Sequence, residues 1–395
     1  MATSFGCCVL EPEDEHTGKH RPLLILTIVI ATVFYGLLLI MNIVGEYAGI
    51  YSRGVNKVSD EYPVDLALST DVLTLWTFIY VWHFVIFIYC IVSIFRKTSL
   101  QKPVYTSPTL LSFFFFGYMA VSYLLLTGWL FLWDRLLIAP AVVFMFVIFG
   151  SLYLALFVSY RKLNHYSKKL RQARRTKEMW MIIVIVQNGV ALFAGWTTVI
   201  FYLNLAVCLV YWNVLAATSS LICLCIFAVH FIIFALTDLT ILHKFTKYVL
   251  TPYIAIAVAL AGMLLKNWRA DSINAIFIAV FLVFVVICAI IKFIRMLIHI
   301  VRANRKVTPP SITISTVTNS TVTNGNSTDY PTTNETSFSS DNNDVDVDEI
   351  IPVIITNPVA DEPVERREPL ATVSEEPEHP LPDRNLFLSE FVLYN

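Results

Sequence analysis

The chain has 395 residues, of which 57% are hydrophobic and only 14% are Asp, Glu, Lys or Arg. In soluble globular domains a little under half of the residues are apolar and about a quarter are charged, so this composition excludes an ordinary soluble domain. The formal net charge of -1 provides no overall positive field, and we expect no nucleic-acid partner.

Residues 1–21 form a short N-terminal arm that carries several acidic residues ahead of the first apolar run, unlike a cleaved signal peptide. We therefore expect the first run to be retained as an anchor. The adjacent Cys7 and Cys8 are candidates for reversible palmitoylation, and two exposed thiols without a role are an equally good interpretation.

Eight long apolar runs follow between residues 22 and 299, which we predict to be the transmembrane domain. A helix of about 20 apolar residues crosses ~30 Å of hydrocarbon with every backbone polar group satisfied. We place the spans at 22–44, 72–95, 109–131, 136–159, 179–206, 213–236, 247–265 and 273–298. The block from 179 to 236 is split near Tyr211, Trp212 and Asn213, because one helix of that length would overshoot a bilayer. The predicted fold class is all-α: a polytopic transmembrane helix bundle of about eight spans in a lipid bilayer.

After the last span the composition changes to Ser, Thr and Asn and then to acidic residues. Such a segment buries too little apolar area to offset its ordering entropy, so we predict that residues 300–395 form a disordered cytosolic tail. Its last ten residues regain apolar character, and the tail is a candidate for binding a protein partner.

Basic residues concentrate in alternate gaps between the spans, and this bias sets the orientation of a membrane protein. One set of gaps holds eighteen: Lys19, Arg21, Arg96, Lys97, Lys102, Arg161, Lys162, Lys168, Lys169, Arg171, Arg174, Arg175, Lys177, Lys244, Lys247, Arg302, Arg305 and Lys306. The other set holds five: Arg53, Lys57, Arg135, Lys266 and Arg269. This predicts that both termini lie in the cytosol, as an even number of spans requires, and the sequence does not indicate which membrane holds the protein.

The middles of the spans contain no Asp, Glu, Lys or Arg, which argues against an ion-coupled transporter. His83 and His230 lie well inside spans and could in principle ligate a haem or relay a proton, but a histidine hydrogen-bonded to a neighbouring helix is the favoured interpretation. The sequence contains no His-Glu-x-x-His, nucleophile elbow, phosphate loop or Cys-x-x-Cys. We expect no enzyme, no metal and no resident cofactor, with porphyrin or haem considered only as a ligand.

Aromatic residues are spaced to share helix faces. Trp76, Tyr80 and His83 follow the i, i+4, i+7 pattern, and Trp129 and Trp133 repeat the i, i+4 relation. Trp196 lies near the middle of the fifth span, between Asn188 and Asn204, in a helix that is unusually polar on one side. Helix-to-helix hydrogen bonding and a lined pocket explain this face equally well.

The sequence Trp-Thr-Phe-Ile-Tyr at 76–80 resembles the Trp-x-x-Leu/Ile-Tyr signature of the tryptophan-rich sensory protein family, also called the TspO/MBR or peripheral benzodiazepine receptor family. Residues 128–135, 194–198, 248–253 and 259–262 are similar to later helices of diverged members, in the same order. The resemblance covers about residues 70 to 290.

The resemblance implies a helical bundle that binds a flat apolar ligand such as a porphyrin or sterol, as a sensor or carrier. The implied aromatic lining is Trp76, Tyr80, Trp129, Trp133 and Trp196, with His83 on the same face as the first two. The implied polar contacts are Asn188, Asn204 and Tyr253.

Two other classes stay open. An uncoupled channel or facilitator could use Gln187, Asn188, His83 and Thr197 to line a polar path. A seven-helix receptor would need an external N-terminus and an odd number of spans, and the distribution of basic residues argues against both.

Overall fold

The computed structural model describes residues 20–52, 58, 61–98 and 101–307. The N-terminal arm up to residue 19, with Cys7 and Cys8, and the tail from residue 308 lie outside the described residues. Within these ranges the chain is almost entirely helical, and the only β-pairing is an isolated bridge between Lys97 and Pro103. The all-α prediction is confirmed.

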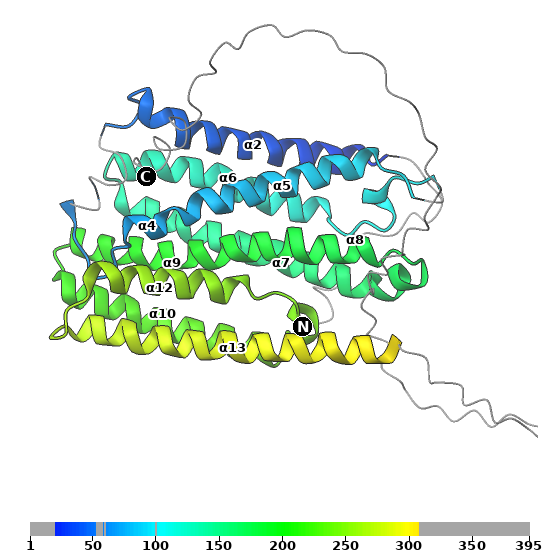
Figure 1. The fold of residues 1–395 in the computed structure, drawn as a ribbon. Helices are drawn as coiled ribbons and strands as arrows, with labels where there is room; N and C mark the ends of the chain where they lie inside the picture. Colours follow the sequence, from blue (N-terminus) through cyan, green and yellow to red (C-terminus); the bar gives the residue numbers. More distant parts are fainter. Residues whose placement is uncertain (1–19, 53–57, 59–60, 99–100, 308–395) are drawn as a thin grey trace, which may run out of the picture.

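The described helices form a single bundle with their axes roughly parallel or antiparallel (Figure 1). They are α2 (Pro22–Tyr47), α4 (Thr70–Leu73), α5 (Leu75–Phe95), η1 (Val104–Thr106), α6 (Phe113–Asp134), α7 (Ile138–Gln172), α8 (Thr176–Met181), η2 (Ile182–Gln187), α9 (Asn188–Tyr211), α10 (Ala216–Leu239), α11 (His243–Thr246), α12 (Thr251–Asn267) and α13 (Ile273–Val307).

Seven helical segments in the described part of the chain are long and apolar enough to cross a membrane. They are Pro22–Gly45, Thr70–Phe95, Phe113–Asp134, Ile138–Gln172, Thr176–Tyr211, Ala216–Leu239 and Ile273–Arg302. The remaining predicted span, 247–265, corresponds to the shorter apolar helix α12, whose 17 residues rise only ~26 Å at 1.5 Å per residue. Each predicted span thus has a helix, and α12 begins only at Thr251, with Pro252 in its first turn.

The predicted division of the block 179–236 is also confirmed. Helix α9 ends at Tyr211 and α10 begins at Ala216. Between these two helices, Asn213 has a positive φ of 66°, and its backbone N–H donates to the carbonyl of Val210 at 2.9 Å. A short polar side chain tolerates this left-handed conformation better than most, so Asn213 ends the helix and turns the chain back.

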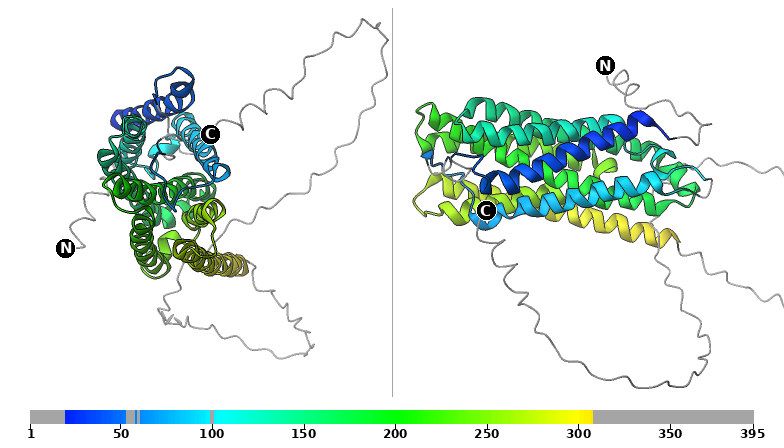
Figure 2. Two further views of the ribbon diagram at one scale, coloured as in Figure 1. Left: turned by 90° about the vertical axis from the view of Figure 1, so that its left-hand side faces the viewer. Right: turned by 90° about the horizontal axis from the view of Figure 1, so that it is seen from above.

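Helix α9 occupies the centre of the bundle, which is visible when the bundle is viewed along its axis (Figure 2). Of the most apolar window of the α8–α9 span, 72% is buried inside the protein, against 28% for the windows in α2 and α13. Helix α9 packs against α5, α7, α10 and α12. Its residues therefore face other helices on nearly all sides, whereas α2 and α13 present large apolar side chains outward, including Val33 and Val280.

A glycine on α9 permits the backbones of α9 and α12 to approach each other closely. At Gly195 on α9, an added Cβ would lie 3.0 Å from Cα and 3.1 Å from the carbonyl oxygen of Pro252 on α12. Any larger residue would push the two backbones apart. Gly195 therefore sets the separation between α9 and α12.

Candidate ligand-binding site

The aromatic stripe predicted on α5 faces the interior of the bundle. Trp76 stacks on Tyr80 with a centroid distance of 5.6 Å and meets Trp196 of α9 edge to face at 5.9 Å. Phe193 of α9 contacts both Trp76, at 6.1 Å, and His83, at 4.9 Å. The structure thus brings Trp76, Tyr80 and His83 of α5 together with Trp196 of α9, which lies more than a hundred positions further along the chain.

Rings from two more helices complete this group. Tyr123 of α6 packs against His83 and Phe193, and Tyr35 of α2 packs against Tyr123 and Phe87. We call the whole set the aromatic cluster; it consists of Tyr35, Trp76, Tyr80, His83, Phe87, Tyr123, Phe193 and Trp196. Offset and edge-to-face contacts of this kind are worth ~0.5–1.5 kcal/mol per pair beyond burial.

His83 holds three helices together. Its Nδ1 lies 2.7 Å from the hydroxyl of Tyr123, and its Nε2 lies 3.3 Å from the carbonyl oxygen of Gly189. A carbonyl only accepts, so Nε2 carries the proton and Nδ1 accepts from the phenol. Both ring nitrogens are occupied, which leaves neither available to bind iron in this arrangement. His230 is likewise hydrogen-bonded across helices, to Tyr202 at 3.0 Å, so the favoured interpretation of both histidines is confirmed.

Trp196 is fully buried, and its indole nitrogen has no acceptor among the described residues. A buried N–H without a partner costs ~1–3 kcal/mol, because it has lost its hydrogen bond to water. The ring of Trp196 meets the half-buried ring of Trp76 edge to face.

Sequence reasoning missed a π-helical turn, η2, that joins α8 to α9. Such turns occur frequently at functional sites, because they release backbone carbonyls from the regular helical pattern. The indole of Trp82 donates to the backbone carbonyl of Ile185 at 2.9 Å. The side-chain amide of Asn188 donates to the backbone carbonyl of Ile183, also at 2.9 Å. No simple sequence pattern marks a π-turn; the polar pair Gln187 and Asn188 within an apolar run was the only signal.

Trp129 and Trp133 form a separate group near the end of α6. They stack at 5.5 Å, and the indole of Trp129 donates to Oδ1 of Asn204 at 2.9 Å. The indole nitrogen of Trp133 is buried without an acceptor among the described residues. The structure therefore joins three predicted site residues, Trp129, Trp133 and Asn204, but in a group distinct from the aromatic cluster.

Asn188 and Tyr253, the other predicted polar contacts, connect helices to one another. The amide of Asn188 donates to the carbonyl of Tyr248 at 3.1 Å and accepts from the backbone N–H of Leu250 at 3.3 Å, next to the start of α12. The hydroxyl of Tyr253 donates to Asp238 at 2.8 Å.

The remaining side chains considered for a polar path also bond within the bundle. Gln187 donates to Ser159 at 3.1 Å. Thr197 donates to the carbonyl of Phe193 at 2.9 Å.

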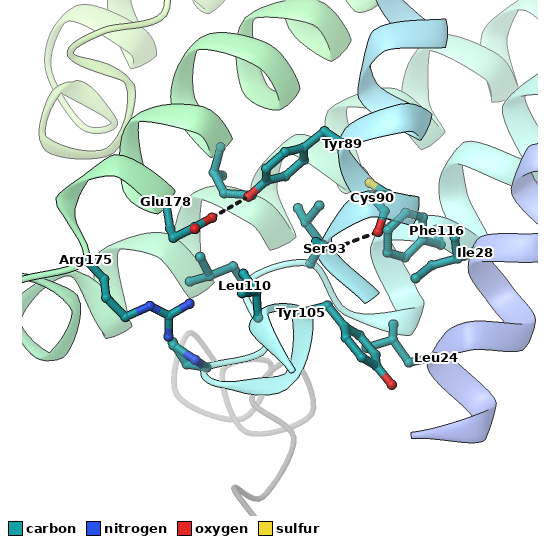
Figure 3. Close-up of a pocket in the computed structure, with 14 residues that line it drawn as sticks. Leu24, Ile28, Tyr89, Cys90, Ser93, Tyr105, Leu110, Phe116, Arg175 and Glu178 are labelled. Carbon is teal, nitrogen blue, oxygen red and sulfur yellow. Dashed lines mark hydrogen bonds between the residues drawn. The ribbon is translucent and has the colours of Figure 1, made fainter. Parts of the chain in front are cut away.

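A cavity of about 410 Å³, including the part open to the exterior, lies between α2, α5, α6 and α8 (Figure 3). Its lining is mostly apolar and comes from residues Leu24, Ile28, Tyr89, Cys90, Ser93, Val104, Tyr105, Pro108, Leu110, Leu111, Phe116, Arg175, Glu178 and Ile182. The apolar lining with few polar groups matches the usual composition of a small-molecule site. The enclosed space measures only about 30 Å³, so a drug-sized ligand would require the lining to open. None of these lining residues was predicted from the sequence.

The cavity and the aromatic cluster lie along the same helix faces. Ile28 and Tyr35 are seven residues apart on α2, and Phe116 and Tyr123 are seven apart on α6; in each pair the first residue lines the cavity and the second belongs to the cluster. A separation of seven residues returns to the same face two turns along a helix. We call the cavity together with the adjacent aromatic cluster the crevice; the cluster itself is a set of rings packed against one another.

Charged side chains lie at one side of the cavity, as Figure 3 shows for Arg175 and Glu178. Glu178 pairs with Arg96 at 2.8 Å and accepts from the hydroxyl of Tyr89 at 3.3 Å. The guanidinium of Arg175 donates to the carbonyl of Ser107. Burial lowers the pKa of Arg175, and the nearby Glu178 carboxylate opposes this effect. An arginine remains charged in proteins, so the cavity has a cationic and an anionic group beside an apolar interior.

The structure shows a buried ion pair that the sequence analysis did not predict. Asp238 and Lys292 are both buried and form an ion pair of 2.7 Å between α10 and α13. The available signal was that Lys292 is followed by further apolar residues, 293–294 and 296–298.

These features define a class: an all-helical, multi-pass membrane protein with aromatic clusters between its helices. The comparison with family models then identifies the particular family. The model of the TSPO-like protein family matches residues 28–293, which is more than half of the chain, so this protein belongs to that family. The resemblance inferred from the tryptophan motifs is confirmed. No curated protein and no solved structure matched.

Proposed function

We propose that the protein binds a flat apolar molecule, of the porphyrin or sterol kind, in the crevice between α2, α5, α6 and α9. The observation that carries the proposal is that an apolar cavity with few polar groups shares its helix faces with a cluster of eight aromatic rings. Family membership supports a role as a sensor or carrier.

The chemistry of the crevice suits a ligand with a large apolar body and one polar end. Aliphatic side chains such as Leu24, Ile28 and Leu111 would cover the body, and Phe116 offers a ring for stacking. An acidic group on the ligand would lie near Arg175, whereas a hydroxyl could bond to Glu178. These two polar contacts would fix the orientation, as in most small-molecule sites.

The proposed orientation places both termini in the cytosol. Arg175 lines the cavity and Arg96 pairs with the lining residue Glu178. Both arginines belong to the basic set of gaps, so the cavity would open at the cytosolic end. Labelling of single cysteines placed before residue 20 and after residue 308 with a membrane-impermeant reagent checks this in sealed vesicles whose cytosolic face points inward. Protection at both positions is expected, and labelling from outside at either one contradicts the orientation.

A pair of neighbouring residues on α5 provides a sharp test of the cavity. Ser93 is 6% exposed and lines the cavity, whereas Val92 is 44% exposed and faces outward. Ser93→Phe fills the cavity with a ring, while the control Val92→Phe adds the same ring to the lipid-facing side. Purified protein in nanodiscs is titrated with a protoporphyrin and, separately, with a fluorescent sterol, and the signal of the ligand is followed.

Saturable binding is expected for the natural protein and for Val92→Phe, and loss of binding for Ser93→Phe. Each variant is first checked for a single symmetrical peak in size-exclusion chromatography, so that misfolded protein is not counted as non-binding. Equal affinity of the two variants for either ligand would place binding outside the cavity. The absence of saturable binding in all three proteins would contradict the proposed function itself.

A further inference from the structure

An exposed basic turn connects α7 to α8. Helix α7 ends at Gln172, and α8 begins at Thr176. Lys168, Arg174 and Lys177 are exposed around this turn, and none of the three has an ion pair or a side-chain hydrogen bond in the part of the chain that the structure describes. We call these three residues the basic tip. Figure 1 shows α8 and the C-terminal end of α13 at the same end of the bundle.

The acidic residues at this end of the bundle are already engaged. Within the described ranges they are Glu178 at the start of α8 and Asp238 at the end of α10, and both are buried. Glu178 pairs with Arg96, and Asp238 pairs with Lys292. Neither carboxylate is therefore free to balance the charge of the basic tip.

The backbone of the turn presents one of these cations in an unusual conformation. Arg174 has a positive φ of 54°, in the left-handed region where the Cβ of most residues is strained and glycine usually ends a helix. The next backbone N–H, that of Arg175, donates to the carbonyl of Leu170 at 2.8 Å and closes the end of α7. The chain thus holds an exposed arginine at a position that the backbone favours for glycine.

The length of α7 carries the basic tip past the lipid headgroups. Residues 138–160 of this helix contain no charged side chain and rise ~35 Å, which is enough to cross ~30 Å of hydrocarbon. Lys168 follows the first cation, Arg161, by seven residues, which is ~10 Å along the helix. Each headgroup layer is only ~5–8 Å thick. The basic tip would therefore meet a water-soluble partner rather than a lipid headgroup.

The chain itself supplies an acidic segment at this end. Helix α13 ends at Val307, and residues 341–378 of the sequence that follows contain twelve acidic and two basic residues. Residues 308–340 connect α13 to this segment, and at ~3.3 Å per residue a chain of that length can span ~100 Å. This is about twice the ~52 Å rise of the 35-residue helix α7, so the acidic segment is long enough to reach the basic tip.

We propose that the acidic segment, residues 341–378, docks on the basic tip of its own chain. Opposite charge provides the attraction, and because both parts belong to one molecule their effective concentration is ~mM. A single exposed ion pair is weak, so the contact depends on several pairs at once. It would place carboxylates beside Arg175, which follows Arg174 and lines the cavity. The contact is independent of the ligand proposed for the crevice.

The test uses photo-crosslinking in the full chain. The photoreactive residue p-benzoylphenylalanine replaces Gln172, which is exposed beside the basic tip. The protein is placed, one copy per disc, in nanodiscs of phosphatidylcholine with a tenth of phosphatidylserine, irradiated and mapped by mass spectrometry. Crosslinks to peptides from residues 341–378 are expected. Their yield should fall at least ~3-fold in 1 M NaCl, where the Debye length is ~3 Å.

Two neutralised variants test the charges from both sides. The first combines Lys168→Gln, Arg174→Gln and Lys177→Gln, and the second changes the acids within residues 341–349 to their amides and leaves the described helices untouched. Each should lower the crosslink yield at least ~3-fold, because several weak ion pairs are lost together. Lys266→Gln, which neutralises an exposed lysine at the other end of the bundle, is the matched control and should leave the yield unchanged.

A second crosslinker position controls for the reach of the segment. Trp212 is exposed in the turn between α9 and α10, at the opposite end of the bundle, and p-benzoylphenylalanine there should give no crosslink to residues 341–378. Equal yields from positions 172 and 212, or equal yields in the natural protein and both neutralised variants, would overturn the proposal. Crosslinks from position 172 to phosphatidylserine alone would assign the basic tip to the membrane surface and overturn it as well.

Discussion

The imidazole of His83 on α5 accepts a hydrogen bond from the hydroxyl of Tyr123 on α6, with 2.7 Å between the two atoms. The opposite nitrogen donates to the carbonyl of Gly189 on α9. One neutral side chain thus joins three helices at the centre of the aromatic cluster. Hydrogen bonds of this kind fix the rotation of each helix, which packing of apolar side chains against lipid cannot do alone.

Removal of the Tyr123 hydroxyl is expected to destabilise the bundle. Tyr123→Phe leaves Nδ1 of His83 as a buried acceptor without a donor, at a cost of ~1–3 kcal/mol. Tyr118→Phe on the same helix is the control, because that hydroxyl has no hydrogen bond to the described residues. The stability of both variants is measured by unfolding them with a denaturing detergent in mixed micelles. Equal midpoints for the two variants would show that the hydrogen bond adds no stability.

Replacement of the tryptophans of the aromatic cluster tests whether they form part of the ligand site. Trp76→Leu and Trp196→Leu should preserve membrane insertion and abolish the absorbance change of a bound porphyrin. Trp212→Leu changes the same residue type at an exposed position in the α9–α10 turn and should leave the response unchanged. If all three variants respond as the natural protein does, the cluster only packs the helices and does not contact the ligand.

Glycine substitutions should show how closely α9 approaches α12. Gly195→Ala places a methyl group against the Pro252 backbone, which cannot move aside as a flexible side chain would, and overpacking of this kind costs ~1–3 kcal/mol. Gly117→Ala on α6 meets nothing within 4 Å and should be neutral or slightly stabilising. Thermal unfolding followed by size-exclusion chromatography compares the two. A fall in the unfolding temperature for Gly117→Ala as large as that for Gly195→Ala would contradict the assigned role of Gly195.

The buried ion pair should behave non-additively. Asp238→Asn leaves the charge of Lys292 buried without its partner, and such a change typically costs ~3–5 kcal/mol. Lys292→Met leaves the carboxylate in the same position, whereas the double variant removes both charges and should recover most of the loss. A double-mutant cycle from thermal unfolding measures the coupling. Strictly additive effects would show that the two groups stabilise the protein independently.

The stability of the protein should fall as His243 becomes protonated. Burial lowers the pKa of His243 from its ordinary value of 6.5, and the nearby charges of Arg295, His299 and Lys292 lower it further, while Asp238 opposes them. His243 is therefore mainly neutral at pH 7.

Because the pKa of His243 is lower in the folded than in the unfolded chain, its protonation reduces stability as the pH falls below about 6.5. Thermal unfolding measured between pH 7.5 and about 5.5, with His243→Gln as the control, checks the prediction. A pH dependence of stability that persists unchanged in His243→Gln would assign the proton to another group.

The sequence by itself determined the class of protein and the positions of its helices. Apolar runs mark each helix because lipid requires every backbone group to be satisfied locally, and the break at Tyr211–Asn213 followed from the length of a bilayer crossing alone. The order of the tryptophan motifs identified the family. The same local information placed Trp76, Tyr80 and His83 on one face of α5.

Only the tertiary structure decided which of these faces meet. Hydropathy does not specify how a helix is rotated about its axis or which helix lies beside it. The partnership of Trp76 with Trp196, and the separate group of Trp129 and Asn204, could not be read from the chain for this reason. The pairing of Asp238 with Lys292, 54 positions apart, has the same origin. Two helices that carry opposite charges can bury both when packing brings the two residues together, because each then satisfies the other.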